Sequence, residues 1–300
     1  MTYKSVLRRI LHIMMRPLVV FLVKTRIGRD ALYSNMPKNE LVISNTDEGI
    51  HYVTNTSDVV IGSWTFEERK SFDGQHLLNT LSLINNDKSV LLDVGANIGT
   101  IGILGVSKGF FKRCIAFEPD PNNFKLLQAN VTLNGLVDKF ELRNEALSNE
   151  SKSSLNFELS ESNYGDHRIQ IKKDHGKYDE QDRTIISVKS NTLDSILVNY
   201  NLNDCLLFMD TQGFEGHVLS GALSLIQAQV PIVTEFWPYG LKRSDGLEMF
   251  YSVLSTARYT SMYDLKFPTQ KLKFSVDTIK KIASELGEDG AHTDLVFLND

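Results

Sequence analysis

The fold of this chain is decided by residues 90–100, which read VLLDVGANIGT. An apolar run reaches Asp93 and passes directly into a loop that holds Gly95 and Gly99, with Gly102 one turn further on. This pattern predicts a buried strand, a turn and a helix in immediate succession. Because ligands of open α/β sheets bind beyond the carboxyl ends of the strands, we expect this loop to line a binding site.

The spacing of the glycines indicates which kind of ligand the loop accepts. A dinucleotide site uses G-x-G-x-x-G because a pyrophosphate must sit on the helix N-terminus, whereas this loop reads G-x-x-x-G after Asp93. A carboxylate there repels a pyrophosphate and suits an ammonium group. Nineteen residues after Gly99, the next strand ends at Glu118, whose carboxylate can accept both hydroxyls of a ribose. The pattern favours S-adenosylmethionine; the alternative is a tight turn in which Glu118 only caps the following helix.

Strands and helices alternate from Ser89 to the end of the chain, and this succession predicts a parallel α/β sheet. The chain closes with helices near 245–256 and 276–286, a strand near 258–263 and an apolar strand at 294–298. The earlier strands are expected at SVLLDVG, RCIAFE, KFELRN, TIISVK, CLLFMD and PIVTEFW, and the earlier helices at DPNNFKLLQANVTLN, TLDSILVNY and EGHVLSGALSLIQ.

Two further segments stand out from this pattern. Residues 41–88 begin with three β-rich runs, LVIS, IHYVT and DVVIG, and are expected to form a β-hairpin followed by a helix. Residues 148–183 are rich in Ser, Asn, Asp and Lys and are too long for a simple connection. We therefore expect residues 89–300 to form one domain that carries a binding loop or insertion near 148–183.

The composition excludes several classes of protein. With 300 residues, 42% of them hydrophobic and 23% charged, the chain is neither disordered nor collagen-like. Cys114 and Cys205 both adjoin apolar runs, so neither a disulfide framework nor a Cys-rich zinc site is expected, and a reducing cytosol is the default location. The net charge of −5 argues against a nucleic-acid binder.

The N-terminal segment, residues 1–40, is basic. Residues 1–30 carry seven Lys or Arg against one acid, and basic residues recur every four positions from Lys4 to Arg16 beside an apolar face. This predicts an amphipathic helix that is kinked at Pro17. Its longest apolar run is far shorter than a membrane span, and no signal-peptide cleavage site follows. The helix is expected either to pack on its own domain or to lie on anionic lipid.

The chain resembles the FkbM-type, S-adenosylmethionine-dependent methyltransferases, which have the class I methyltransferase fold. The resemblance rests on LLDVGANIGT, IAFEPDPNNFKLLQANVTLN, NEALSN, SNYG, TLDSIL, MDTQGFEGHVLSGA and TEFW, which follow the family's order between residues 60 and 298. It implies a Rossmann-like sheet of seven mostly parallel strands, the last of them antiparallel, with helices on both faces. It also implies O-methylation of a hydroxyl, often on a sugar or polyketide-type acceptor. In one departure, Phe208 stands where the family often has a lysine.

The resemblance also implies roles for individual residues. Glu118 would hold the ribose, and Asn144 with Ala146 would border the adenine. The other expected cofactor residues are Asp93, Gly95, Ala96, Asn97, Gly99 and Pro119, and the residues expected along the acceptor side are Asp210, Glu215 and Glu235.

Methyl transfer to a hydroxyl requires positioning and a proton acceptor. Asp210 ends an apolar strand, and Glu235 lies within one, where a carboxylate without a partner is costly to bury. Glu215 could instead complement the dipole at a helix start. Asp210 and Glu235 could also bind a hard cation, but no third ligand has a definable spacing, so no metal is predicted. The histidines considered as proton acceptors, each with a packing or surface role as its alternative, are His167, His217 and His292.

The sequence therefore predicts an S-adenosylmethionine-dependent O-methyltransferase that acts on a hydroxyl of a sugar, glycan or other small molecule. A dinucleotide-dependent oxidoreductase and a catalytically silent nucleotide-binding module are the alternatives, since both would share the sheet and the ribose carboxylate. The expected partner is a small-molecule, sugar or lipid-linked glycan acceptor. A cytoplasmic protein is expected, with residues 1–29 on the inner face of an anionic membrane as one alternative. The pattern defines neither the acceptor nor the oligomeric state.

Overall fold

The computed structural model describes residues 3–84, 88–173, 175–178 and 180–299. Its centre is an eight-stranded sheet with the order β13-β12-β14-β11-β10-β3-β4-β5. The strands from β11 to β5 are parallel, and β14, the last strand, runs antiparallel to both of its neighbours. The bounds are β3 (Val90–Val94), β4 (Arg113–Phe117), β5 (Phe140–Arg143), β10 (Cys205–Met209), β11 (Ile232–Phe236), β12 (Ser261–Asp264), β13 (Leu272–Lys273) and β14 (Thr293–Leu298).

This sheet confirms the predicted α/β fold with an antiparallel last strand, and it corrects the number of strands. The edge strand β13, two residues long, makes eight strands where seven were expected. A strand of two residues is too short to show a periodicity in the sequence. Its pairing with β12 depends on the fold around it.

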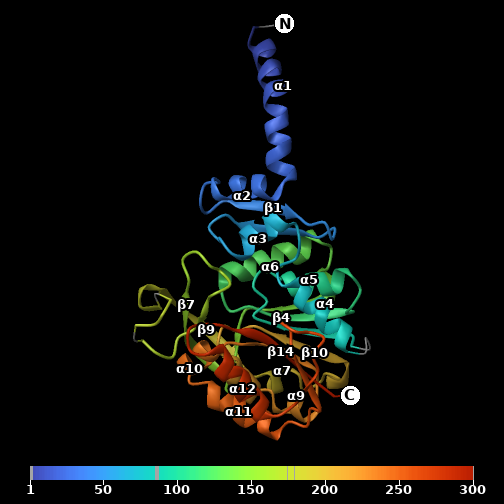
Figure 1. Cartoon of the computed structure of the whole chain (residues 1–300), viewed down its shortest axis with the longest axis vertical. Helices are drawn as coiled ribbons and strands as arrows, with labels where there is room; N and C mark the ends of the chain where they lie inside the picture. Colours follow the sequence, from blue (N-terminus) through green and yellow to red (C-terminus); the bar gives the residue numbers. More distant parts are fainter. Residues whose placement is uncertain (1–2, 85–87, 174, 179, 300) are drawn as a thin grey trace.

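Helices cover both faces of the sheet (Figure 1). Leu91 packs with the helices on one face and Leu92 with those on the other, because successive residues of a strand point to opposite sides. Both residues are fully buried, which explains why the central strands read as continuous apolar runs. One face holds α4 (Gly74–Leu83), α5 (Thr100–Ser107) and α6 (Pro121–Leu133); the other holds α8 (Glu215–Ser220), α9 (Leu223–Gln227), α11 (Leu247–Thr256) and α12 (Val276–Leu286).

A second, four-stranded sheet contains two segments of the polar stretch 148–183, β7 and β8. Its order is β6-β9-β7-β8, with bounds β6 (Ala146–Leu147), β7 (Lys152–Leu159), β8 (Arg168–Ile169) and β9 (Thr184–Asn191). The run TIISVK, expected in the main sheet, is part of β9, so that prediction of its place is wrong. Strand propensity does not specify a partner, and β7 supplies an antiparallel one.

Two expected helices are shorter than their patterns. The stretch TLDSILVNY gives only α7 (Leu193–Ile196). The stretch EGHVLSGALSLIQ divides into α8 and α9 at Gly221, where a Cβ would lie 2.1 Å from the carbonyl oxygen of Ser148. The backbone just after β6 therefore occupies the space that a side chain at this position would need.

The segment before the main sheet begins with an antiparallel hairpin of β1 (Leu41–Asn45) and β2 (His51–Asn55). The third run, DVVIG, is not a strand. The Asp58 carboxylate accepts hydrogen bonds from the N–H groups of Val60 and Gly62, and α3 (Ile61–Glu68) begins there. A side chain that caps the start of a helix overrides the β preference of the two valines.

The N-terminal helix α1 (Tyr3–Lys24) projects away from the rest of the molecule (Figure 1). It continues through Pro17 and is joined to α2 (Arg26–Ser34), which packs against α1 so closely that a Cβ on Gly28 would lie 2.4 Å from the Cα of Leu22. In the part of α1 whose side chains the structure describes, Ile13 and Met14 are 66% and 72% exposed, so the expectation that the helix packs its apolar face on its own domain is wrong for that part. No helix among the described residues is long and apolar enough to cross a membrane.

Candidate active site

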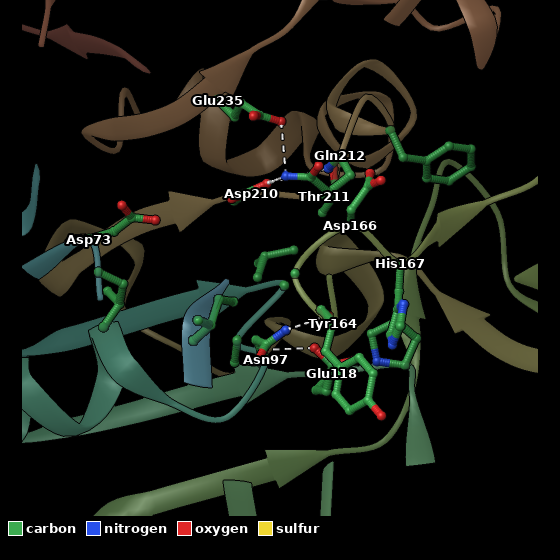
Figure 2. Close-up of a pocket in the computed structure, with 18 of the residues that line it drawn as sticks. Asp73, Asn97, Glu118, Tyr164, Asp166, His167, Asp210, Thr211, Gln212 and Glu235 are labelled. Atoms are coloured by element: carbon green, nitrogen blue, oxygen red, sulfur yellow. Dashed lines mark hydrogen bonds between the residues drawn. The ribbon is translucent and has the colours of Figure 1, made fainter. Parts of the chain in front are cut away.

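One cavity of about 430 Å³ opens at the carboxyl ends of four neighbouring strands, β4, β3, β10 and β11. Each strand contributes a carboxylate to its lining: Glu118, Asp93, Asp210 and Glu235 respectively. Figure 2 shows Glu118 at one end of this group and Glu235 at the other. Among the described residues that line the cavity, none is Lys or Arg. The cavity therefore favours a ligand with positive charge over one with phosphate groups.

The loop after β3 brings its backbone to the edge of the cavity. Gly95 has φ +82°, and a Cβ there would lie 1.7 Å from the carbonyl oxygen of Asp210. The N–H groups of Gly95 and Ala96 both donate to the carbonyl of Phe117, which fixes this loop beside the end of β4. Only glycine fits at position 95, since both its conformation and its neighbour exclude a side chain.

Gly99 supports the loop without lining the cavity. It has φ +92° and directly precedes α5, and a Cβ there would lie 2.6 Å from a methyl carbon of Leu127 in α6. Its role is thus close packing of α5 against α6, and not contact with a ligand.

Glu118 is buried and held by two backbone hydrogen bonds. One carboxylate oxygen accepts from the N–H of Asn97 at 2.8 Å and the other from the N–H of Asp120 at 2.8 Å. Burial raises the pKa of Glu118 to about 8. Each oxygen keeps a further lone pair, so the group can accept two more hydrogen bonds from a ligand in the cavity.

The stretch 160–167 of the polar excursion folds over the loop after β3, as expected for a binding loop (Figure 2). The side-chain amides of Asn97 and Asn123 donate to the carbonyl of Tyr164 at 2.8 and 3.0 Å. Asn97 has φ +51°, a conformation that Asn tolerates better than most residues. These bonds place Tyr164 against the same end of the cavity as Glu118.

Asp93 has a structural partner as well as a place in the cavity lining. Its Oδ2 accepts a hydrogen bond from the N–H of Gly102 at 2.9 Å, within the first turn of α5. Burial raises the pKa of Asp93 to about 7. One of its oxygens is therefore committed to the helix start, and a ligand ammonium would share this carboxylate with it.

Asn144 and Ala146, predicted to border the adenine, and Pro119, predicted as a further cofactor residue, have different positions. Pro119 and Ala146 line the cavity, and Glu145 between the third strand and Ala146 lines it as well. Asn144 does not: its side-chain amide donates to the carbonyls of Glu118 and Pro119 at 2.8 and 3.1 Å. Asn144 therefore positions the loop that carries Glu118.

Asp210 and Glu235, two of the residues expected along the acceptor side, both line the cavity. The side-chain amide of Gln212 donates to Asp210 at 2.7 Å and to Glu235 at 3.4 Å. Burial raises the pKa of Asp210, and it raises the pKa of Glu235 further, helped by the charge of Asp210. Phe208, where the family often has a lysine, also lines the cavity.

Glu215 lies behind this pair and does not line the cavity. Its Oε1 accepts from the N–H and hydroxyl of Thr211, both at 2.9 Å, and from the N–H of Gly213 at 3.2 Å. Its Oε2 is buried without a hydrogen-bond partner among the described residues. Burial raises the pKa of Glu215 to about 7. Glu215 thus shapes the loop that carries Gln212 rather than contacting an acceptor.

The histidines fit the role of proton acceptor poorly. The Nδ1 of His167 accepts a hydrogen bond from the N–H of Ser160 at 3.0 Å, and burial lowers the pKa of His167 to about 4. The ring lines the cavity as a neutral group whose basic nitrogen is already used. His217 stacks on Phe214 outside the cavity. His292 lines the cavity, and burial lowers its pKa.

Several lining residues were not predicted. His76 and Asp294 approach each other to 3.2 Å at one wall, and the aromatic side chains of Tyr178 and Trp237 form another. The register of β11 with β14 places Asp294 opposite Glu235. Of these residues, only Asp294 could have been found from the sequence, because it begins the predicted closing strand. His76 comes from α4, whose approach to the sheet depends on tertiary packing.

The comparisons with known proteins agree with this architecture. The sequence model of the family described as "Methyltransferase FkbM domain" matches residues 93–256, more than half of the chain. The protein therefore belongs to the FkbM methyltransferase domain family, which confirms the resemblance noted in the sequence. The comparison with curated proteins found no match.

Three similar solved structures are all distant in sequence. The FkbM methyltransferase from Methylobacillus flagellatus is 18% identical with a TM-score of 0.43, and the match covers 72% of this chain and 45% of that one. An O-methyltransferase from Bacillus cereus solved with SAH is 13% identical, with a TM-score of 0.42 and coverage of 76% and 81%. A putative O-methyltransferase from Klebsiella pneumoniae is 13% identical, with a TM-score of 0.41 and coverage of 77% and 81%. The chain thus spans less than half of the M. flagellatus protein.

Proposed function

We propose that this FkbM-family chain binds S-adenosylmethionine in the cavity and methylates a hydroxyl of a sugar-like or other small acceptor. The observation that carries the proposal is the row of carboxylates at the ends of β4, β3, β10 and β11, in a cavity whose described lining has no Lys or Arg. A cofactor with a sulfonium, an ammonium and a ribose suits this row, whereas the pyrophosphate of a dinucleotide does not. The same lining disfavours the oxidoreductase alternative.

The residues present fit the cofactor from one end of the cavity to the other. The two oxygens of Glu118 are pre-oriented by the N–H groups of Asn97 and Asp120, and their open lone pairs suit a ribose diol. Ala146 and Pro119 offer apolar surface for a base beside Glu118. Asp93 lies on the neighbouring strand, where its carboxylate suits an ammonium.

The acceptor is assigned to the side with Asp210 and Glu235. When bound, S-adenosylmethionine supplies an electrophilic methyl group, so a C–O bond forms as the C–S bond breaks and the sulfonium becomes a neutral thioether. Asp210 and Glu235 are the groups that accept hydrogen bonds from the acceptor hydroxyl and take its proton. Tyr178 and Trp237 add flat apolar surface beside these carboxylates, a combination suited to the faces and hydroxyls of a sugar ring.

The test is methyl transfer from ¹³C-methyl S-adenosylmethionine to a panel of sugars, nucleotide sugars and polyols, with carbon NMR of the product. The proposal expects the label on oxygen and one S-adenosylhomocysteine formed for each methyl ether. Label found on nitrogen or carbon would refute the hydroxyl as acceptor. A wild-type protein that fails to bind S-adenosylhomocysteine in calorimetry would refute the cofactor assignment.

A further inference from the structure

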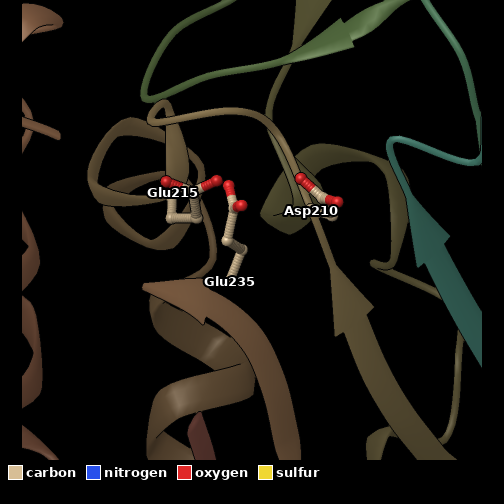
Figure 3. A group of neighbouring side chains, drawn as sticks. All are labelled: Asp210, Glu215 and Glu235. Carbon is tan, nitrogen blue, oxygen red and sulfur yellow. The ribbon is translucent and has the colours of Figure 1, made fainter. Parts of the chain in front are cut away.

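The carboxylates of Asp210, Glu215 and Glu235 form one compact group. Each offers an oxygen, and these oxygens all lie within 4.8 Å of one another. They come from three places in the fold: the end of β10, the first residue of α8 and the fourth residue of β11. Figure 3 shows the Glu215 and Glu235 carboxyl groups pointing toward each other, with Asp210 on the neighbouring strand.

The surroundings of this group supply little positive charge. The charged groups that act most strongly on Glu235 are all acidic: Asp210, Glu215, Asp294 and Asp166. On Asp210 the favourable charge comes from His292. Three carboxylates this close together repel one another unless protons or a cation compensate them.

The second observation is the orphaned oxygen of Glu215. This side chain is fully buried, its Oε1 receives three hydrogen bonds, and its Oε2 has none among the described residues. Buried polar atoms in native proteins have partners, and an orphan indicates a missing one. Figure 3 shows an oxygen of the Glu215 carboxyl group facing Glu235, and a ligand common to all three carboxylates would sit between these groups.

We infer that Asp210, Glu215 and Glu235 together bind one divalent cation of the hard, oxygen-preferring class, such as Mg²⁺. An all-carboxylate donor set suits such a cation. Opposite oxygens around Ca²⁺ are about 4.8 Å apart and around Mg²⁺ about 4.2 Å, so a group whose oxygens lie within 4.8 Å can bind a cation of the size of Ca²⁺, and a small approach of the side chains would suit Mg²⁺. Asp210 and Glu235 line the cavity, so the open positions of the cation would face an acceptor.

The inferred site revises the sequence prediction of no metal and deepens the proposed function, on which its role in methyl transfer rests. Sequence spacing gave only two ligands, and the loop 211–214 brings Glu215 to them. A cation there would bind an acceptor hydroxyl and favour loss of its proton. Acceptors with two adjacent hydroxyls, as sugars have, would bind better than simple alcohols, because both oxygens can reach one cation.

The test uses MnCl₂ alone with EDTA-treated full-length protein, and electron paramagnetic resonance of the free Mn²⁺. We expect one Mn²⁺ per chain and competition by MgCl₂. Glu215→Gln keeps an acceptor oxygen for Thr211 and Gly213 but removes a charge, so it should fold as well as the wild type and weaken Mn²⁺ binding at least tenfold. Glu141→Gln, which changes a carboxylate in β5 outside the cavity, should leave Mn²⁺ binding unchanged.

Absence of Mn²⁺ binding at millimolar concentration, or equal binding by wild type and Glu215→Gln, would overturn the inference. Calorimetry of S-adenosylhomocysteine on the EDTA-treated protein separates this from the proposed function. If the nucleoside binds and Mn²⁺ does not, the cation site is wrong and the cofactor site stands. If Mn²⁺ binds and the nucleoside does not, the cation site stands and the cofactor site is wrong.

A second inference rests on α1, which is independent of the cavity. Its apolar side chains from Ile13 to Val23 are exposed, except that of Leu22, which is half-buried; Met14, for example, is 72% exposed. The base of the helix is fixed: the guanidinium of Arg29 donates to the carbonyls of Lys24 and Val23 at its end, and to that of Glu67 in α3. Exposed apolar surface of this extent on an anchored helix points to a binding surface.

The charges identify what this surface contacts. Between residues 1 and 24 the chain has five Lys or Arg and no acid, while residues 31–300 carry 25 bases against 36 acids. We propose that α1 binds the surface of an anionic lipid bilayer, with apolar side chains among the acyl chains and basic ones at the headgroups. The acidic body of the protein would then face the aqueous phase.

Co-sedimentation of the full-length chain with vesicles tests this. Binding is expected to vesicles with phosphatidylglycerol and not to pure phosphatidylcholine, and to weaken as salt shortens the Debye length toward about 8 Å. Leu18→Ser with Phe21→Ser, and Arg16→Glu with Lys24→Glu, should each weaken binding at least tenfold. The matched control, Lys112→Glu with Lys139→Glu on the exposed body, should not. Equal binding to both lipids, no binding, or burial of α1 in a dimer would overturn the proposal.

Discussion

Replacing Glu118 by Gln should weaken S-adenosylhomocysteine binding about 30- to 150-fold. The carboxylate already accepts backbone hydrogen bonds on both oxygens, and a ribose would add one to each. A hydrogen bond to a charged group contributes about 1.5–3 kcal/mol. An amide keeps one acceptor oxygen, while its NH₂ group meets the N–H of Asn97 or Asp120. We therefore expect a loss of about 2–3 kcal/mol in binding free energy.

The same residue gives the binding a pH dependence. Burial raises the pKa of Glu118 to about 8 from its ordinary 4.5, so at neutral pH the cavity holds this group mostly protonated. A ribose diol prefers the carboxylate, so binding releases a proton. Affinity should thus rise about tenfold per pH unit toward pH 8 and then level off. Between about pH 4.5 and about pH 8, Glu118 is protonated in the folded protein and ionised in the unfolded chain. The free energy of unfolding therefore falls as pH rises through this range, whereas below it Glu118 has no effect.

Calorimetric titration with S-adenosylhomocysteine from about pH 6 to about pH 9 measures both effects. The affinity of Glu118→Gln should lack the rise with pH that Glu118 causes. Titration of the ligand itself affects both proteins equally, so the difference between their pH profiles reports on Glu118. Glu141→Gln, a change in β5 outside the cavity, is the matched control and should bind as the wild type does. If Glu118→Gln binds within threefold of the wild type with the same pH slope, the assignment of Glu118 to the ribose is refuted.

Four other substitutions test other parts of the site. Gly95→Ala should abolish S-adenosylhomocysteine binding and lower the melting temperature, because its Cβ would meet the carbonyl of Asp210 at 1.7 Å; a wild-type affinity would contradict the described loop. Asn97→Ala should remove about 1 kcal/mol of unfolding free energy and speed hydrogen exchange around Tyr164. Unchanged exchange would argue against the hydrogen bond from Asn97 to the carbonyl of Tyr164. Asp210→Asn and Glu235→Gln should retain nucleoside binding but lose at least about 100-fold in turnover; wild-type rates on a verified acceptor would refute their role.

Strand ends were the most predictable part of the site. Asp93, Glu118 and Asp210 each follow or end an apolar run, and parallel strands bring such ends to one edge of the sheet, where the structure has them. Local patterns suffice here because both the strand and its polar terminus are encoded in adjacent residues. Glu235 was found by the same reasoning, since a carboxylate within a buried strand needs a purpose.

Contacts between segments distant in the chain were not predictable. The sequence indicates β9 as a strand but not its partner β7, and it does not show that the backbone at Ser148 leaves no room for a side chain at Gly221, where α8 ends. Likewise, the sequence alone indicates that Glu215 favours the start of a helix. Only the conformation of the loop before it brings it to Asp210 and Glu235. Such facts depend on packing, which periodicity does not record.

The central claim is that one cavity holds S-adenosylmethionine along the row of carboxylates. A crystal structure of the full-length chain with S-adenosylhomocysteine tests it most directly. The account predicts ribose hydroxyls within hydrogen-bonding distance of both oxygens of Glu118, the base against Ala146, and the sulfur directed toward Asp210 and Glu235. A nucleoside bound elsewhere, or bound in the cavity with its ribose away from Glu118, would contradict it.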